Sequence, residues 1–255
     1  MCTLKRFDRT CEIISNKEIC TNYFELKIKA GNIAKYCLPG QFFMIGIPGV
    51  FLRRPISVYD SKKNVLSFLY KVVGKGTAIL SRMCSGQLQV LGPLGKGYDL
   101  EICKELNYVI VAGGTGIASL HFLAIKLGKN KAKKRTLYYG ARSKKDLLCL
   151  DKFKEIGWKV VVSTEDGSKG YKGYITDILE EKVKDSDVLF ACGPMPMLKK
   201  VVQIAKEKKI KGFVSLEEKM ACGVGNCQGC AVNINKVIKM TCKDGPVFEI
   251  EEVEL

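Results

Sequence analysis

The sequence has too little glycine and proline for a fibrous chain, and it has no long uncharged run that is free of helix breakers. It contains 25 Gly and 7 Pro among 255 residues, and its 47% apolar content is too high for intrinsic disorder. Residues 36–52 and 106–125 carry no charge, but each run is interrupted by several glycines or prolines, which argues against a membrane helix. The first ten residues carry charges where a signal peptide needs an apolar segment. We therefore expect a folded cytoplasmic protein without a transmembrane segment.

Positive charge exceeds negative charge by 16, from 42 Lys and Arg against 26 Asp and Glu. Such an excess fits either a basic surface for an anionic ligand or partner, or a well-solvated lysine-rich surface. No zinc-finger, helix-turn-helix or aromatic-basic pattern accompanies the charge. We prefer the solvated surface and expect no nucleic-acid partner.

Short runs with β character alternate with turn residues up to about residue 99, for example residues 23–28, 41–45 and 65–73. Strands of this length and spacing predict an antiparallel β-barrel. After residue 105 strands and helices alternate, which predicts a parallel sheet covered by helices. The expected strands are 108–112, 136–139, 159–163 and 188–191, and the expected helices are 117–127, 145–156, 175–183 and 196–208.

The fold class is therefore α+β and multidomain, with expected divisions at 1–102, 103–211 and 212–255. The last segment is too short for a hydrophobic core of its own, so we expect something other than burial to hold it together. Its acidic end, residues 249–255, predicts a solvated tail or a docking edge for a partner.

Four of the twelve cysteines lie in the last 34 residues with the spacing C-x4-C-x2-C, followed by the fourth after eleven residues. This is the plant-type [2Fe–2S] spacing, which predicts that the cluster is ligated by Cys222, Cys227, Cys230 and Cys242. Interleaved glycines let such a loop turn tightly and aim its amides at the sulfurs, which raises the reduction potential. Structural zinc also accepts four thiolates, but its sites usually combine two separate C-x2–4-C arms. The iron–sulfur interpretation is favoured.

Two segments in the first part of the chain have the chemistry of a flavin site. In the first, Arg54 would meet a pyrophosphate and Ser57 the isoalloxazine ring, with Pro55 and Ile56 between them. The second runs from the strand residues Leu69, Tyr70 and Lys71 to Gly76 and Thr77, which would open a helix whose free amides hold phosphate. The alternatives are a chance Arg-Pro pair and an ordinary strand-to-helix turn.

Two further segments predict a dinucleotide site in the second part of the chain. A strand precedes and a helix follows the run Gly113, Gly114, Thr115 and Gly116, which favours phosphate binding there. Another strand ends at Cys192, Gly193 and Pro194, where ligands bind in parallel sheets, although Cys192 could also be a small buried residue. Arg142 would suit the 2′-phosphate of NADP, whereas Glu165 or Asp166 would suit the ribose hydroxyl of NAD, so these residues leave the choice open.

Together and in this order, the segments RPIS, LYKVVGKGT, GPLGKGY, VAGGTGIASL, YYGAR and CGPMPML resemble the ferredoxin-reductase superfamily. With its C-terminal cysteines the chain most resembles the electron-transfer subunits of class 1B dihydroorotate dehydrogenases. The resemblance implies that the two flavin segments bind FAD, that the four cysteines hold [2Fe–2S] and that the two dinucleotide segments frame NAD(H). It also implies a catalytic partner subunit that holds FMN and oxidises dihydroorotate, with two copies of each subunit.

A nicotinamide pocket and a one-electron cluster in one chain need an intermediate that handles both one and two electrons, and flavin is the common choice. We therefore expect electrons to pass from partner FMN through [2Fe–2S] and FAD to NAD⁺, in pyrimidine biosynthesis. Hydride transfer needs no general base, so we expect no catalytic side chain, and the single histidine, His121, is predicted to serve packing or polar support. The alternatives are a diaphorase-type subunit of another complex, such as a ferredoxin:NADP oxidoreductase, hydrogenase or sulfur reductase, and a non-redox zinc-stabilised basic module. Some related diaphorase subunits look as though they replace the first cluster ligand by Asp, whereas this chain has Cys222 there.

Overall fold

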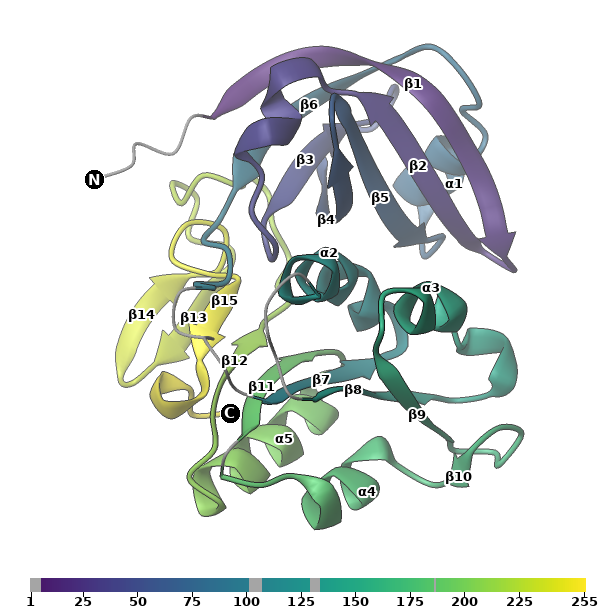
Figure 1. The fold of residues 1–255 in the computed structure, drawn as a ribbon. Coiled ribbons are helices and arrows are strands. Elements are labelled where there is room, and N and C mark those ends of the chain that lie inside the picture. Colours follow the sequence, from purple (N-terminus) through teal and green to yellow (C-terminus); the bar gives the residue numbers. More distant parts are fainter. Residues whose placement is uncertain (1–5, 101–106, 129–133, 186) are drawn as a thin grey trace.

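Six antiparallel strands close into a barrel in the computed structural model, which describes residues 6–100, 107–128, 134–185 and 187–255 (Figure 1). In spatial order these strands are β1 (Phe7–Cys20), β2 (Tyr23–Lys29), β5 (Val65–Lys71), β4 (Arg54–Lys62), β3 (Phe42–Gly46) and β6 (Gln87–Leu94). A 3₁₀ turn, η1 (Gly31–Tyr36), and a short helix, α1 (Lys75–Ser81), complete this part. Inside the barrel, Phe43 and Phe68 meet edge to face with ring centroids 5.7 Å apart. The predicted barrel is confirmed.

A seven-stranded sheet follows, in the order β10-β9-β8-β7-β11-β12-β15. Its strands are β7 (Asn107–Gly113), β8 (Arg135–Ala141), β9 (Lys159–Thr164), β10 (Tyr171–Lys172), β11 (Asp187–Cys192), β12 (Lys211–Ser215) and β15 (Val247–Glu249). All neighbours pair in parallel except β12 and β15, which are antiparallel. The predicted parallel sheet is therefore confirmed, with one antiparallel edge strand added.

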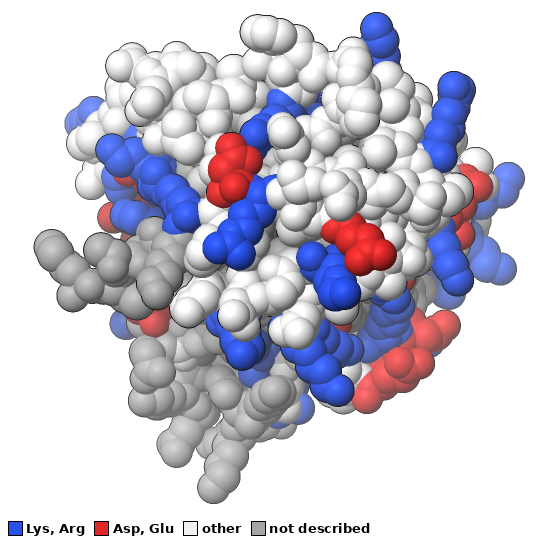
Figure 2. Space-filling view, turned by 90° about the horizontal axis from the view of Figure 1, so that it is seen from above, with Lys and Arg blue, Asp and Glu red and all other residues white. Residues whose placement is uncertain are grey.

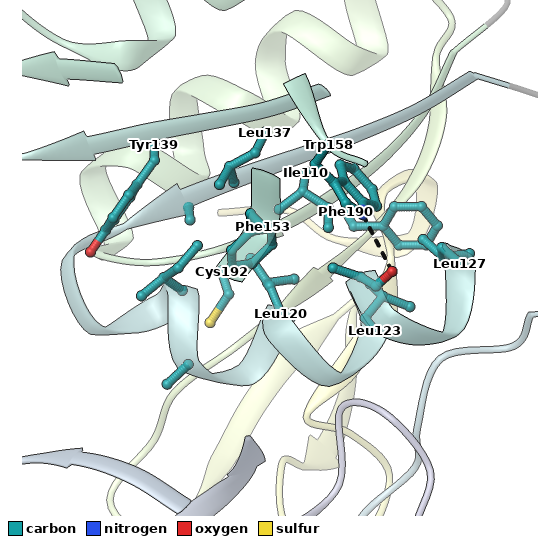
Figure 3. Packing of buried hydrophobic residues seen from close by; sticks show 14 of the residues in the cluster. Ile110, Leu120, Leu123, Leu127, Leu137, Tyr139, Phe153, Trp158, Phe190 and Cys192 are labelled. Carbon is teal, nitrogen blue, oxygen red and sulfur yellow. Dashed lines mark hydrogen bonds between the residues drawn. The ribbon is translucent and has the colours of Figure 1, made fainter. Parts of the chain in front are cut away.

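Helices cover both faces of this sheet (Figure 1). Helices α2 (Ile117–Leu127) and α3 (Leu150–Glu155) lie between the sheet and the barrel, and α4 (Ile175–Lys182) and α5 (Met195–Glu207) cover the other face. Figure 3 shows Leu120, Leu123 and Leu127 of α2 packed on sheet residues such as Ile110 and Phe190. The Trp158 Nε1–H donates to the Ala124 carbonyl at 3.3 Å, so the ring fixes the middle of α2 against the start of β9.

The helix predicted over residues 145–156 is wrong in its first half. A 3₁₀ turn, η4 (Lys144–Asp146), is followed by extended backbone at Leu147, and α3 begins only at Leu150. The Leu148 N–H donates to the Tyr139 hydroxyl at 3.3 Å, and Cys149 takes a left-handed conformation with φ of 57°. A tertiary hydrogen bond therefore replaces the first helical turn that the local pattern favours.

The C-terminal segment packs into the hydrophobic core of the α/β domain. It contains the hairpin of β13 (Ala231–Ile234) and β14 (Val237–Met240), strand β15 and the 3₁₀ turn η5 (Ile250–Glu252). The side chains of Ile234, Ile250 and Val253 are fully buried in the core beneath α5. The expectation that burial does not hold this segment is wrong, because it shares the core of the preceding domain.

The solvated tail predicted for residues 249–255 is also wrong. The carboxylates in this stretch face outward, and Glu252 pairs with Lys239 at 3.0 Å, but the apolar residues between them point inward. The division predicted at residue 211 falls at the first residue of β12, and the division at 102 lies outside the described residues.

Charged side chains are dispersed over the face of the molecule that Figure 2 shows. Seen from above the barrel, Lys and Arg are scattered around a largely uncharged face rather than gathered in one patch (Figure 2). This distribution agrees with a solvated lysine-rich surface. Among the residues described, no helix is both long and apolar enough to cross a lipid bilayer.

His121 on α2 contacts the barrel. Its ring stacks on that of Tyr59 in β4 with centroids 4.2 Å apart, and its Nδ1–H donates to the Tyr59 carbonyl at 3.2 Å. Both side chains are buried. The prediction that His121 serves packing is confirmed.

The burial of His121 predicts a pH-dependent stability. Desolvation lowers the pKa of this ring to about 4, although the hydrogen bond to the Tyr59 carbonyl acts to raise it. The unfolded chain therefore binds more protons than the folded one between the unfolded pKa of about 6.5 and the folded pKa, and stability falls as the pH falls through this window. We expect the melting temperature of the protein to drop more between about pH 7 and about pH 5 than that of His121→Phe, which keeps a ring but takes no proton. Parallel melting profiles of the two proteins would contradict this prediction.

Candidate functional site

A cavity of about 1050 Å³ opens between the barrel and the α/β domain. The barrel contributes Tyr23 and Lys71 to its walls. The α/β domain contributes the loops that follow β7, β8, β9 and β11, all at the carboxyl edge of the sheet. Ligands of parallel α/β sheets bind at this edge, and the volume is large enough for a dinucleotide.

The structure brings the two predicted dinucleotide segments together at one end of this cavity. Strands β7 and β11 are parallel neighbours, so the run that begins at Gly113 and the run that begins at Cys192 end side by side. A Cβ atom on Gly116 would run into the backbone carbonyl of Cys192, and one on Gly193 would lie 2.9 Å from the backbone of Gly113. The close approach requires glycine at both positions. It also places the N-terminus of α2 at the cavity wall, where amides and the helix dipole favour an anion.

Cys192 has a carboxylate neighbour in this region. The Cys192 thiol is buried, and its Sγ lies 3.9 Å from Oε1 of Glu217. Burial, followed by the charge of Glu217, raises the pKa of the thiol to about 12, so Cys192 is a neutral thiol at neutral pH. Burial also raises the pKa of the Glu217 carboxyl, which lines the cavity. Sequence reasoning missed Glu217, and the only signal for it is its place two residues after β12, at the same carboxyl edge.

Arg142 and Glu165 both line the cavity, after β8 and β9 respectively. Asp166 is not among the lining residues, and its carboxylate instead accepts hydrogen bonds from the backbone and hydroxyl of Ser168, at 2.9 and 2.6 Å. Of the two carboxylates proposed for a ribose hydroxyl, the structure brings only Glu165 to the cavity.

The predicted flavin segments meet at the edge of the barrel. The Arg54 guanidinium lies against Gly76 in the first turn of α1, and its Nη1–H donates to the Leu52 carbonyl at 2.6 Å. Thr77 closes this turn, since its hydroxyl accepts from the backbone N–H groups of Val73 and Gly74 at 2.9 and 3.2 Å. The arrangement leaves a guanidinium beside a glycine-rich helix start, which suits a pyrophosphate.

The other residues predicted to bind the flavin differ in how much of their side chains is accessible to a cofactor. Ser57 is partly exposed on β4, and Lys71 lines the cavity at the end of β5. The side chains of Ile56 and Tyr70 belong to the barrel core, where the Tyr70 hydroxyl donates to Asn16 at 3.2 Å. These two residues present little side-chain surface to a cofactor.

The cysteine loop aims backbone amides at sulfur. The Cys222 Sγ accepts hydrogen bonds from the N–H groups of Val224 and Cys227, both at 3.4 Å, and the Cys230 Sγ accepts from the Cys242 N–H at 3.4 Å. Gly225 has a φ of 89°, which favours glycine, and this conformation turns its N–H toward the Cys242 sulfur. Desolvation acts to raise the pKa of the Cys222 thiol, but the amides of Cys227 and Val224 outweigh it and lower the pKa to about 6. A thiolate is the form that binds metal.

The four thiols lie as two adjoining pairs, Cys222 with Cys227 and Cys230 with Cys242. In the part of the chain that the structure describes, no three His, Cys, Asp or Glu side chains meet closely enough to hold one metal ion. Four cysteine thiolates are the ligand set of a [2Fe–2S] cluster, and structural zinc also accepts four, so it is the spacing of the cysteines that favours the cluster. The thiols of Cys230 and Cys242 pack on Phe42 and Met44 of the barrel.

Known protein families match both the cysteine segment and the α/β domain of this chain. Residues 217–254 match the model of the iron–sulfur cluster binding domain of dihydroorotate dehydrogenase B, and residues 110–203 match the oxidoreductase NAD-binding domain. The chain is 39% identical over 254 residues to the electron transfer subunit of dihydroorotate dehydrogenase B (NAD⁺) from Caldanaerobacter subterraneus subsp. tengcongensis, covering 97% of this chain and 99% of that protein. The subunit of the same name from Clostridium perfringens is 42% identical over 217 residues, or 84% and 86% of the two chains.

Solved structures agree with these matches. The structure of an NADH-dependent reduced ferredoxin–NADP oxidoreductase superposes with a TM-score of 0.84 at 34% identity, covering 96% of this chain and 89% of that one. A ferredoxin NADP⁺ reductase from Neisseria gonorrhoeae, with a TM-score of 0.67 at 18% identity over 79% and 91% of the two chains, shares the fold. The chain belongs to the family of electron transfer subunits of dihydroorotate dehydrogenase B.

Proposed function

We propose that this chain passes electrons from a catalytic partner subunit through a [2Fe–2S] cluster and FAD to NAD⁺. One observation carries the proposal: the cluster loop packs on β3, and the flavin segment lies on the neighbouring strand β4. Phe42, which packs on Cys230 and Cys242, is the cross-strand partner of Ser57 in the β3–β4 ladder. Directly opposed residues in an antiparallel pair are about 5 Å apart at Cα and point to the same face.

The chemistry of the groups explains why a flavin belongs between the other two. NAD⁺ takes up a hydride, a cluster exchanges single electrons, and a flavin supplies both kinds of exchange when bound. The chain's own residues bind and orient these groups. Cys222, Cys227, Cys230 and Cys242 would ligate the iron, and the amides around Cys222 would stabilise the reduced, more negative cluster.

The nicotinamide nucleotide would bind across the carboxyl edge of the sheet. The loop of Gly113, Gly114, Thr115 and Gly116 would hold its phosphates at the start of α2, and the loop of Cys192, Gly193 and Pro194 would lie beside the nicotinamide. Glu165 would accept hydrogen bonds from the adenosine ribose, which favours NAD(H) over its 2′-phosphorylated form.

The partner would be the catalytic subunit that holds FMN and oxidises dihydroorotate, with two copies of each subunit in the complex. The relatives' shared name, electron transfer subunit of dihydroorotate dehydrogenase B, supports this partner. A diaphorase subunit of another complex is the second candidate, since the ferredoxin–NADP oxidoreductase structure matches nearly the whole chain. Co-purification with a flavoprotein that oxidises dihydroorotate distinguishes the two. The cytoplasmic location stays a prediction.

Replacing Cys227 by Ser tests the pathway. Loss of one thiolate ligand should abolish the cluster's visible absorbance and its EPR signal after reduction, while FAD stays bound. We expect dihydroorotate-dependent NAD⁺ reduction by the complex to be lost and direct flavin reduction by NADH to be kept. Cys84→Ser is the matched control, because Cys84 is exposed on the barrel side of the molecule and should change neither property. Partner-dependent turnover that persists without a cluster would show that the pathway is wrong.

Replacing Arg54 by Ala should weaken FAD binding by about tenfold to about 100-fold, because a charge-assisted hydrogen bond is worth roughly 1.5–3 kcal/mol. The measurement is the FAD dissociation constant by flavin fluorescence, with flavin content after gel filtration as a second reading. Arg53→Ala is the control, since the Arg53 guanidinium is paired with Asp8 at 3.0 Å instead of facing α1. Equal FAD affinity in the Arg54 variant and the unmodified protein would rule out this assignment.

Replacing Glu165 by Ala should lower kcat/KM for NADH by about tenfold, the value of one charged hydrogen bond, and raise it for NADPH because a repulsive carboxylate is removed. The experiment compares both nucleotides in flavin reduction. Asp166→Ala, the neighbouring carboxylate outside the cavity lining, should leave the ratio of the two unchanged. An unchanged ratio in the Glu165 variant would refute its role at the ribose.

A further inference from the structure

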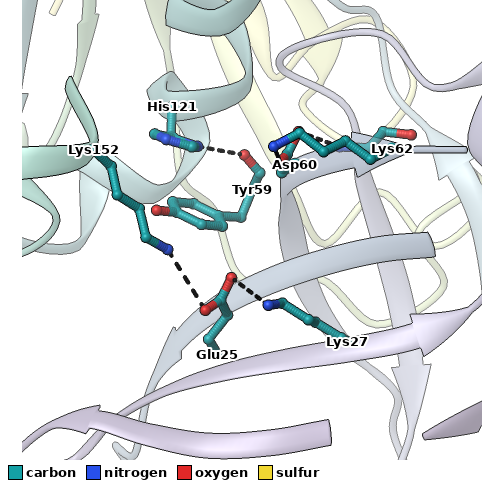
Figure 4. Close-up of polar contacts among 8 residues, drawn as sticks. Glu25, Lys27, Tyr59, Asp60, Lys62, His121 and Lys152 are labelled. Atoms are coloured by element: carbon teal, nitrogen blue, oxygen red, sulfur yellow. Dashed lines mark hydrogen bonds and ion pairs between the residues drawn. The ribbon is translucent and has the colours of Figure 1, made fainter. Parts of the chain in front are cut away.

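Tyr59 joins the barrel to the α/β domain by both faces of its ring (Figure 4). The His121 ring from α2 stacks on Tyr59 at 4.2 Å with an interplanar angle of 14°. Lys152 from α3 places its ammonium 4.9 Å from the centre of the same ring, a cation–π distance. The Tyr59 side chain is 1% exposed, so the ring is enclosed by these contacts.

An ion pair and a thiol extend this contact. Lys152 Nζ lies 3.6 Å from Glu25 Oε2 on β2, and Glu25 also meets Lys27 at 3.6 Å. The Tyr59 hydroxyl lies beside the Cys149 thiol at the start of α3, and burial raises the pKa of both groups. The Tyr59 ring on β4 and the Glu25–Lys152 ion pair on β2 thus attach two barrel strands to helices α2 and α3.

Tyr59 and His121 lie close in sequence to the residues predicted to bind the flavin and the nicotinamide nucleotide. On β4, Ser57 and Tyr59 are two residues apart and point away from the barrel core, which takes Ile56 and Val58. On α2, His121 lies about one turn beyond the glycine loop that lines the cavity. Strand β4 carries Ser57, the hydroxyl predicted to meet the flavin, and helix α2 begins at the predicted nicotinamide site. The contact between Tyr59 and His121 therefore holds this strand and this helix together.

We propose that the Tyr59–His121 stack is a positioning contact that fixes the distance between the flavin on the barrel and the nicotinamide on the α/β domain. The proposal rests on the proposed function. When both groups are bound, the nicotinamide would give a hydride with its electron pair to the flavin, so one group would be oxidised as the other is reduced. Such a step needs reacting atoms about 3–3.5 Å apart, and a displacement of about 1 Å costs about 100-fold in rate. In the proposed function the flavin would bind mainly to the barrel and the nicotinamide nucleotide mainly to the α/β domain, so the contact between the domains would set that distance.

His121→Ala tests the proposal because it removes the stack and the hydrogen bond but leaves every cofactor-lining residue in place. We expect NADH to reduce the bound flavin between about tenfold and about 100-fold more slowly in rapid mixing experiments. The kinetic isotope effect with 4-deuterated NADH should rise, and the charge-transfer absorbance of the NADH–flavin complex should weaken. FAD content and the dissociation constant for NAD⁺ should stay unchanged. His121→Phe, which keeps the stacked ring, should restore most of the rate.

Ile204→Ala is the control for a general loss of stability, because Ile204 is fully buried in α5 on the opposite face of the sheet. It should lower the melting temperature without changing the isotope effect. Lys152→Met gives a second route if His121→Ala fails to fold: its ammonium is partly exposed, and its loss should slow hydride transfer several-fold with the same rise in isotope effect.

Wild-type rates and isotope effects in both His121→Ala and Lys152→Met would overturn the positioning role, as would an equal change in Ile204→Ala. These outcomes are separable from failure of the proposed function. If NADH does not reduce the FAD of the unmodified protein, the function itself is wrong. If NADH reduces the FAD of the unmodified protein and both variants show the same rate and isotope effect, only the positioning role is wrong.

Discussion

Strand β4 contacts the α/β domain through α2, its neighbour β3 contacts the cysteine loop, and the electron path depends on this placement. The Arg54 end of β4 reaches the start of α1, Ser57 faces the same side as Phe42, and Tyr59 is buried beneath α2. A β-strand can do this because alternate side chains share a face, so Ser57 and Tyr59 lie on one face about 7 Å apart, beside a register shift between Val58 and Asp60. The flavin site, the cluster loop and the domain contact are therefore spaced by backbone geometry instead of by flexible loops. This rigidity matters for electron and hydride transfer, since both depend steeply on distance.

The features that sequence could predict are those whose signal is local. The barrel strands alternate, the parallel strands are continuous apolar runs, and the cysteine spacing itself encodes the loop that aims amides at Cys222. These features need no knowledge of distant partners. The two predicted nucleotide segments were found for the same reason, because each joins a strand to a helix.

Errors arose where a distant residue decides the local structure. The helix over residues 145–156 loses its first turn because the Tyr139 hydroxyl binds the Leu148 amide. Residues 249–255 look like a solvated tail by charge, but Ile250 and Val253 fit a core formed by the sheet together with α4 and α5. Glu217 was missed because its neighbour Cys192 is 25 residues away in sequence. Tyr59 has no motif, and only the fold reveals that it meets His121.

Strand β15 closes the edge of the nicotinamide-binding sheet, yet it lies after all four cluster cysteines in the chain. The six barrel strands precede the α/β domain in the chain, although the barrel core also includes Phe122 of α2. The sheet of the second domain lacks its edge strand until the segment that carries the cysteines has been synthesised. One stretch of chain therefore carries both the thiols and the last strand of the sheet, so the α/β domain cannot be complete before all four cysteines have been added.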